Sequence, residues 1–312
     1  MTSHAAVHAV VVNWNGGAAQ NLACVESLLA QGLDPARVHF VDNASTDGSC
    51  EVLEQAHPGL AFLRNAANLG FGEGANLGAR AALANGAEAV FFVNNDLTLP
   101  VGTLDALVDG LDRHERAGLV GPRVLDAADP RVVWCAGGEL SWRQNLSTLR
   151  GNGEHDSDEF RRELRMDYLP GCALLVRRAC LEQVGLFDAG YFAYMEDVDL
   201  GVRASAAGFE SWLIGAAAAH HASSSATGGG YNPRRKYMMG VNSVWFLRAH
   251  GGAAAWLRFA LFDVLSLPFV WFAKLPKGEG RAVVAKAWGI CAGLRGKHVQ
   301  ASDLEPGGTW LW

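Results

Sequence analysis

The sequence lacks a surplus of basic residues, since 26 Lys and Arg stand against 32 Asp and Glu, which gives a formal net charge of −6. Proteins that bind nucleic acid usually carry excess positive charge, so this balance argues against nucleic acid as a partner. Local basic runs remain, among them Arg234-Arg235-Lys236. Because half of the 312 residues are hydrophobic, we expect a packed core, in one large domain or in one domain with a smaller appendage.

Cysteine motifs and a leader sequence are also missing. The six cysteines form no Cys-x-x-Cys pair and no Cys/His cluster with zinc-finger spacing. We therefore expect buried or free thiols in a reducing compartment. The first eight residues contain no basic region followed by a long apolar run, so the sequence predicts no signal peptide and a cytoplasmic location.

The sequence has no uninterrupted apolar run of the roughly 20 residues that a transmembrane helix needs. Its most apolar stretch, residues 259–273, is broken by Asp263 and Pro268 and flanked by Arg258 and Lys274. Three interpretations stay open: a core helix packed on the main domain, an interfacial segment resting on a membrane, and a true span. The second would give a peripheral membrane contact at the inner face of the cell membrane.

Short apolar runs alternate with helical patterns through the first third of the chain. Strands are predicted at residues 7–12, 38–41, 60–63 and 89–93, and helices at residues 18–31, 49–57 and 76–85. This alternation indicates an α/β fold in which helices flank a mostly parallel sheet. After a weaker pattern at residues 126–158 and a hinge at Gly228-Gly229-Gly230, helices are predicted at residues 237–250 and 253–273.

Polar clusters follow three of the predicted strands. They are Asn13-Trp14-Asn15, Asp42-Asn43 and Asn94-Asn95-Asp96. Ligands bind parallel sheets at the carboxyl ends of the strands, so these loops should converge on one crevice, which favours a nucleotide site. Asp96 is placed to offer a carboxylate to a divalent cation that neutralises a departing diphosphate. Taken singly, an Asn-Asp pair after a strand is more often a turn or a helix cap, and Asp42-Asn43 has the same ambiguity.

A glycine-rich segment covers residues 68–76 and begins Asn68-Leu69-Gly70-Phe71-Gly72. We interpret it as a loop that enters a helix and lets the backbone approach a phosphate or a sugar closely. A dinucleotide-binding fingerprint is the competing interpretation. That fingerprint should follow the first strand, whereas this segment follows the third.

An acidic and aromatic cluster occupies residues 187–200. Its acids are Asp188, Glu196, Asp197 and Asp199, and they stand among Tyr191, Phe192 and Tyr194. Crowded carboxylates repel one another, so at least one pKa should rise unless a cation compensates. Arg203 is placed to pair with Asp199 on a helix. An acidic helix start would explain Asp199, but a carboxylate beside an aromatic sugar pocket is a natural general base.

Six of these segments, in this order, resemble the family 2 glycosyltransferases, in particular their rhamnosyltransferase-like branch with the GT-A fold. The matching residues are 10–16, 41–49, 68–72, 92–96, 171–178 and 187–203. The resemblance runs over about residues 7–245. It implies a Rossmann-like catalytic domain over residues 1–230, which binds the nucleotide sugar and the acceptor, and a helical C-terminal extension over residues 231–312.

The resemblance also implies roles for individual residues. Asp42 would contact the base of the nucleotide, and Asn13, Asn15 and Asn68 would line the donor pocket. The other candidates for donor binding are Asn43, Gly70, Phe71, Asn76 and Asn95. Asp197, in the pair Glu196-Asp197, would be the catalytic base.

The metal motif departs from the family pattern in its first residue. Asp96 resembles the last acid of the family's Asp-x-Asp motif, which begins here with Asn94. His220 or His221 would be the further ligand of Mg²⁺ or Mn²⁺, and the one that faces Asp96 is the better candidate. A second departure is Gly240-Val241-Asn242, which stands where relatives commonly have Arg-Asn.

The implied activity is inverting transfer of rhamnose or another hexose from a dTDP- or UDP-sugar. The acceptor would be a cell-surface glycan or a lipid-linked sugar, as in cell-wall or polysaccharide biosynthesis. A nicotinamide-dependent oxidoreductase is one alternative, but Asn13-Trp14-Asn15-Gly16-Gly17 fits its first loop poorly. A non-catalytic carbohydrate-binding relative is the other, and it should have lost Asp96 or Asp197, both of which are present.

Overall fold

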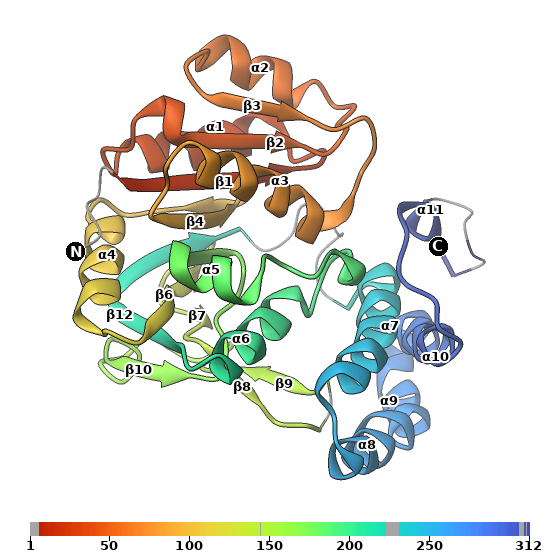
Figure 1. The fold of residues 1–312 in the computed structure, drawn as a ribbon. Coiled ribbons are helices and arrows are strands. Elements are labelled where there is room, and N and C mark those ends of the chain that lie inside the picture. Colours follow the sequence, from red (N-terminus) through yellow and green to blue (C-terminus); the bar gives the residue numbers. More distant parts are fainter. Residues whose placement is uncertain (1–5, 144, 223–230, 306–308, 310) are drawn as a thin grey trace.

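A mixed sheet forms the centre of the molecule (Figure 1). The computed structural model describes residues 6–143, 145–222, 231–305, 309 and 311–312. The strands of the sheet lie in the order β10 (Glu163–Met166), β12 (Glu210–His221), β6 (Ala117–Asp126), β11 (Ala173–Arg177), β4 (Ala89–Asn94), β1 (Val7–Asn13), β2 (Val38–Asp42) and β3 (Ala61–Arg64). Two short strands join it, since β5 (Leu97–Thr98) pairs with β12 and β7 (Val133–Cys135) pairs with β6.

The predicted parallel arrangement holds for one half of the sheet. Strands β3, β2, β1 and β4 are parallel to one another, and β6 is parallel to β12. However, β11 lies antiparallel between β4 and β6, and β10 is antiparallel to β12. The sheet is therefore mixed, although the half formed by β3, β2, β1 and β4 has the expected parallel strands.

Helices cover both faces of the sheet, which explains why its central strands are apolar throughout. On one face α1 (Ala18–Leu29), α2 (Ser49–Ala56) and α4 (Thr103–Arg113) share a hydrophobic core that includes alternate residues of β1, such as Ala9 and Val11. On the other face α3 (Gly70–Ala84), α5 (Arg178–Val184) and α6 (Glu196–Ala206) share a second core that includes Val10. Burial on both faces selects the continuous runs of Val and Phe that predicted these strands.

The glycine-rich segment is part of a helix, so the prediction of a loop over residues 68–76 was wrong beyond Leu69. Helix α3 begins at Gly70, six residues before the predicted start. Glycine lowers helix propensity, but here it permits close packing. A Cβ atom at Gly78 would lie 2.4 Å from Val10 Cγ1, and one at Gly74 would lie 2.9 Å from Asn43 Nδ2. The glycines therefore allow α3 to pack closely against β1 and against Asn43, the residue that follows β2.

The C-terminal helices form a bundle beside α6. They are α7 (Pro233–His250), α8 (Ala253–Phe259), the π-helical turn η4 (Ala260–Val264), α9 (Leu267–Lys274), α10 (Gly280–Leu294) and α11 (Ala301–Leu304). Helices α7 and α10 approach closely, since a Cβ atom at Gly289 would meet Tyr237 O at 2.1 Å. The expected hinge at Gly228-Gly229-Gly230 and the domain boundary after residue 230 lie outside the described residues.

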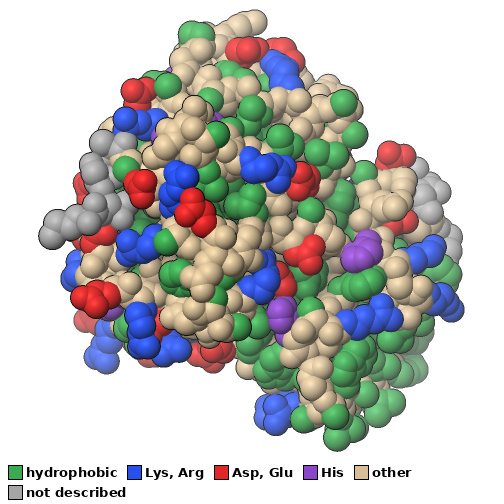
Figure 2. All heavy atoms as spheres, viewed as in Figure 1, with side chains coloured by type: hydrophobic (Ala, Val, Ile, Leu, Met, Phe, Trp, Pro, Cys, Tyr) green, Lys and Arg blue, Asp and Glu red, His purple; other side chains and the backbone are tan. Residues whose placement is uncertain are grey.

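The segment Ala253–Lys277, called here the apolar segment, is exposed. It has the length and composition of a membrane-crossing helix, with a hydropathy of 1.5 in its most apolar window, yet only 17% of that window is buried. Phe269 is 77% exposed and Phe272 is 67% exposed. Hydrophobic side chains gather over this part of the molecule, at the lower right of Figure 2. The interpretation of residues 259–273 as a core helix was therefore wrong.

Candidate functional site

Asn13 joins the three polar strand ends that the sequence predicted to converge. Its Nδ2 lies 3.1 Å from Asp42 Oδ1, and its Oδ1 accepts from Asn95 Nδ2 at 2.9 Å and from the Gly16 N–H at 3.2 Å. The residue has no exposed surface. Convergence is thus confirmed, but the Asn13 amide holds the loops together and presents no free group to a donor.

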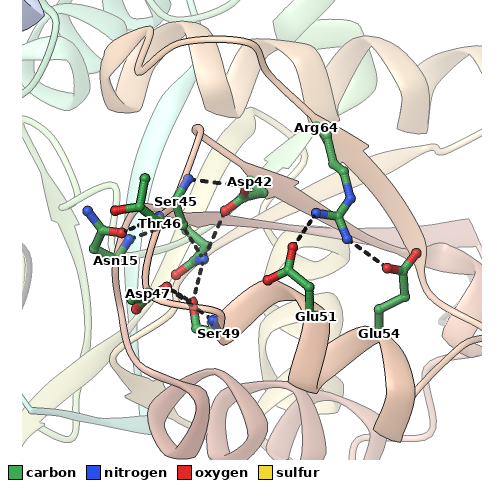
Figure 3. Close-up of polar contacts among 10 residues, drawn as sticks. Asn15, Asp42, Ser45, Thr46, Asp47, Ser49, Glu51, Glu54 and Arg64 are labelled. Carbon is green, nitrogen blue, oxygen red and sulfur yellow. Dashed lines mark hydrogen bonds and ion pairs between the residues drawn. The ribbon is translucent and has the colours of Figure 1, made fainter.

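The loop after β2 carries a further layer of polar contacts (Figure 3). Asp42 Oδ2 accepts from the Ser45 N–H at 3.2 Å, and Asn15 Oδ1 accepts from the Thr46 N–H at 2.8 Å. Asp47 accepts from both the N–H and the hydroxyl of Ser49, at the start of α2. Asn15 is exposed, with a left-handed backbone at φ 50°, so it remains available at the rim of the site.

Three more of the asparagines predicted to bind the donor are buried, and their side chains already form hydrogen bonds within the protein. Asn43 donates to Gly70 O at 2.8 Å, and Asn95 donates to both Asn13 and Asn21. Asn76 exchanges two hydrogen bonds with the backbone of Phe187, which ties α3 to the start of the acidic and aromatic cluster at residues 187–200, called here the acidic segment. The structure favours a positioning role over direct ligand contact for Asn43, Asn76 and Asn95.

The segment Asn68 to Phe71 connects the donor side with the acidic segment. Asn68 is partly exposed, and its Oδ1 accepts from the Gly70 N–H at 2.9 Å. Gly70 has φ +84°, and the Phe71 N–H donates to Phe192 O at 2.6 Å. A Cβ atom at Gly70 would lie 2.4 Å from that same oxygen, so only glycine fits this contact.

Asp96 and His221 meet where β5 pairs with the end of β12. His221 lies opposite Leu97 in this pairing, and His220 lies opposite Thr98. Because successive side chains of a strand point to opposite faces, one histidine only can face Asp96. It is His221, whose Nε2 lies 3.1 Å from Asp96 Oδ1 and whose ring packs edge-on against Trp134.

Polar atoms of Asp96 and His221 are buried without hydrogen-bond partners among the described residues. Asp96 Oδ1 and both ring nitrogens of His221 are buried, and no described residue makes a hydrogen bond to them. Buried polar atoms without such partners are rare and often mark an ion site. Within the described ranges, no group of three or more His, Cys, Asp or Glu side chains is placed to hold a metal. The pair would therefore supply two protein ligands.

Glu196 and Asp197 are the first two residues of α6, and their carboxyl groups have different hydrogen-bond partners. The Gly171 N–H donates to Asp197 Oδ2 at 3.0 Å, and the Val198 N–H donates to Oδ1 at 2.8 Å. Burial raises the pKa of Asp197, and these hydrogen bonds limit the rise. Burial, and then the charge of Asp197, raise the pKa of Glu196 well above its usual value. Glu196 Oε2 is buried with no hydrogen-bond partner among the described residues.

The acidic pair lies close to the metal candidate. The Asn94 N–H donates to Cys172 O at 2.8 Å, and the neighbouring Gly171 is the residue that donates to Asp197. Burial raises the pKa of the Cys172 thiol, and the charges of Asp96 and Asp197 both add to this shift. Strand β11 thus carries the link between the end of β4 and the start of α6.

The other acid of α6 has a structural role. Asp199 is buried and pairs with Arg203 Nε at 2.7 Å, as the sequence predicted, and also with His250 Nε2 at 2.7 Å. The partner His250 comes from α7 and was not foreseen. This triad fixes α6 against the C-terminal helices.

Asn242 holds the segment that leads to the acidic pair, and it was not among the predicted site residues. Its buried Nδ2 lies 2.8 Å from each of the carbonyl oxygens of Tyr191, Ala193 and Tyr194. Phe192, Tyr194 and Met195 have positive φ values of 61°, 70° and 78°. Such strain persists only where surrounding contacts maintain it. The polar pair Asn242-Ser243 within the largely apolar stretch at residues 237–247 was the available sequence signal.

Comparison with known proteins identifies a curated relative of this chain. The chain is 36% identical over 209 residues to an N-acetylglucosaminyl-diphospho-decaprenol L-rhamnosyltransferase of Mycobacterium tuberculosis, and the match covers 59% of this chain. The chain spans 65% of the length of that curated relative.

Solved structures show the same fold at low sequence identity. The mannosyltransferase PcManGT of Pyrobaculum calidifontis, in complex with GDP-Man and Mn²⁺, aligns with a TM-score of 0.56 and 16% identity over 94% of this chain and 88% of its own. GalNAc-T7, with UDP, GalNAc and Mn²⁺, aligns with a TM-score of 0.57 and 14% identity over 69% of this chain and 42% of its own. The GT-A fold is thereby confirmed. A model of glycosyl transferase family 2 matches residues 9–185, more than half of the sequence, and the chain belongs to this family.

Proposed function

We propose that the protein is a metal-dependent, inverting glycosyltransferase that moves a sugar from a nucleotide diphosphate to an acceptor hydroxyl. The observation that carries the proposal is that Asp96 and His221 lie 3.1 Å apart, close to Asp197. The Gly171 N–H donates to Asp197, and the neighbouring Cys172 is hydrogen-bonded to Asn94 at the end of β4. Membership of glycosyl transferase family 2 supports the same reaction class. Asn13, at the end of β1, is hydrogen-bonded to Asp42 and to Gly16 in the following loop. These contacts within the protein disfavour a nicotinamide enzyme, whose cofactor would bind at this loop.

Asp96 and His221 would hold a divalent cation, Mg²⁺ or Mn²⁺. A carboxylate suits Mg²⁺ or Mn²⁺. The buried atoms of Asp96 and His221 without hydrogen-bond partners fit such an ion. The remaining ligands would come from the donor diphosphate and water. When bound, the cation would stabilise the negative charge of the departing diphosphate.

Asp197 would act as the general base. Its carboxylate accepts the proton of an acceptor hydroxyl, and the oxygen attacks the anomeric carbon from the face opposite the diphosphate. The bond between that carbon and the phosphate oxygen breaks, and the nucleotide diphosphate leaves with the electron pair. A single displacement inverts the anomeric configuration. The two backbone N–H groups on Asp197 hold its carboxylate in place for this step.

The substrates are inferred from the relative's name and from the exposed surface. The mycobacterial relative is named for L-rhamnose transfer to N-acetylglucosaminyl-diphospho-decaprenol. We infer a dTDP- or UDP-linked rhamnose or other hexose as donor, and a sugar on a lipid diphosphate as acceptor. The apolar segment would rest on the inner face of the membrane that contains this lipid, helped by the exposed cations Arg258, Lys277 and Arg281.

A screen of nucleotide sugars tests the proposal. Purified protein is incubated with dTDP-rhamnose, UDP-hexoses or GDP-hexoses, with Mn²⁺ or EDTA, and with N-acetylglucosamine carried on a short prenyl diphosphate. We expect one donor to give a product heavier by one sugar, seen by mass spectrometry, and the reaction to stop in EDTA. Stabilisation by NAD with no response to dTDP, UDP or GDP would overturn the proposal.

A further inference from the structure

A group of basic side chains lies between the acidic pair and the apolar segment. It consists of Arg234, Arg235 and Lys236 in the first turn of α7, together with Lys274 at the end of α9, and is called here the basic cluster. Lys274 has a partner, Glu279, at 2.7 Å. The other three side chains form no ion pair with any carboxylate among the described residues.

The positive charge of the basic cluster is undercompensated. The Nε atoms of Arg234 and Arg235 are buried and have no hydrogen-bond partner among the described residues. Burial, followed by the charges of Lys286 and Arg235, lowers the pKa of Lys236 to about 8. Nearby Asp263 offsets this shift only in part, because its carboxylate is paired with Lys286. Cations that are drawn together without a matching carboxylate form a site for an anion.

Aromatic rings contact the basic cluster on two sides, toward the acidic pair and toward the apolar segment. The Arg235 guanidinium lies over the Tyr194 ring, 5.3 Å from its centroid, and Tyr194 precedes Glu196 by two residues. On the other side, the ammonium groups of Lys236 and Lys274 lie 4.4 and 4.2 Å from the centroid of the Tyr231 ring. Cation–π contacts of this kind fix a charge without neutralising it. The cluster therefore spans from the acidic segment to the end of α9.

We propose that the basic cluster binds the diphosphate of the lipid-linked acceptor, an inference that rests on the proposed function. Such an acceptor has three parts: a sugar, which must reach Asp197; a lipid, which must stay with the apolar segment; and the diphosphate that joins them. The cluster lies between the surfaces that would take the two ends. Arginine offers phosphate a planar pair of N–H donors, and the N-terminus of α7 adds a favourable dipole.

The binding of geranyl diphosphate, a short and soluble prenyl diphosphate, tests this site directly. Its affinity is measured by titration calorimetry for the wild type, Arg235→Gln and Arg234→Gln/Arg235→Gln. The matched control is Arg248→Gln, because Arg248 also lies over an aromatic ring, that of Trp245, but near the other end of α7. We expect the double variant to lose at least tenfold in affinity and the control less than twofold. Thermal shifts with dTDP, UDP or GDP should be unchanged and show that the variants fold.

Three results would overturn the inference. The first is an equal loss of geranyl diphosphate affinity in the double variant and in Arg248→Gln, which indicates a general effect of charge. The second is a selective loss of nucleotide affinity, which assigns the cluster to the donor. The third is a loss of binding to vesicles containing phosphatidylglycerol with unchanged geranyl diphosphate affinity, which assigns it to lipid headgroups. Failure of sugar transfer with intact, cluster-dependent geranyl diphosphate binding would instead contradict the proposed function.

Discussion

Glu196 and Asp197 are adjacent in the chain but have different electrostatic surroundings. Two backbone N–H groups stabilise the ionised form of Asp197. Glu196 is buried, lacks such a partner at Oε2 among the described residues, and has the more strongly raised pKa. Because the pKa of Glu196 is raised more strongly than that of Asp197, we expect the pair to lose its first proton mainly from Asp197, which leaves Asp197 as the acid that can serve as the base.

Replacing each acid by its amide tests this division. Asp197→Asn removes the base and should lower kcat by about 10²–10⁴-fold, the usual contribution of general base catalysis. Glu196→Gln resembles the protonated acid and should keep most of the activity. Because the pKa of Asp197 is raised, kcat/KM of the wild type and of Glu196→Gln should fall with decreasing pH at values above the usual range of aspartate. Equal losses in the two variants would contradict the assignment.

The two adjacent histidines provide a matched pair for the metal site. His221→Gln removes the ring that faces Asp96, whereas His220→Gln alters the opposite side of the same strand. Loss of a residue that only orients a ligand commonly weakens metal binding about 10–100-fold. We therefore expect His221→Gln to raise the Mn²⁺ concentration for half-maximal activity by at least roughly tenfold, with little change for His220→Gln. The reverse order would refute the pairing with Asp96.

At the scale of elements, the strands were predictable and the long-range hydrogen-bond partners of the polar residues were not. Strands β1, β2, β3 and β4 begin and end within a residue of the predicted positions, because burial on both faces leaves a continuous apolar run. The asparagines were predicted as donor contacts, yet their partners, such as Phe187 for Asn76, are far away in the chain. The choice of His221 likewise depends on the register between β5 and β12, which local sequence patterns do not encode.

The contact between the start of α3 and the acidic segment should be intolerant of a single methyl group. Gly70→Ala forces a left-handed φ on alanine, at a cost of about 1–2 kcal/mol, and also places its Cβ against Phe192 O. Gly86→Ala is the control, since Gly86 has φ +82° but open space around its Cβ position. Urea unfolding should show a larger loss of stability for Gly70→Ala, together with reduced kcat. Equal destabilisation would show that the contact is unimportant.

At the scale of the whole molecule, the apolar segment is expected to control membrane binding. Phe269→Asp/Phe272→Asp removes two exposed aromatic side chains from it. Burying one Phe in an apolar phase contributes about 1.5–3 kcal/mol, so vesicle binding in a flotation assay should fall by more than roughly tenfold. Val101→Asp is the control, because Val101 is 81% exposed but lies after β5, in the part of the chain that forms the sheet. Unchanged flotation of the double variant would contradict the membrane contact.

The buried pair of Lys286 and Asp263 has a topological consequence. Asp263 lies within the π-helical turn of the apolar segment and is fully buried, and Lys286 reaches it from α10. Drawing the segment through a bilayer would separate the two charges and leave a carboxylate facing hydrocarbon, which costs several kcal/mol. We therefore expect the pair to keep both ends of the apolar segment on one side of the membrane, with α10 in the same aqueous compartment as Asp197.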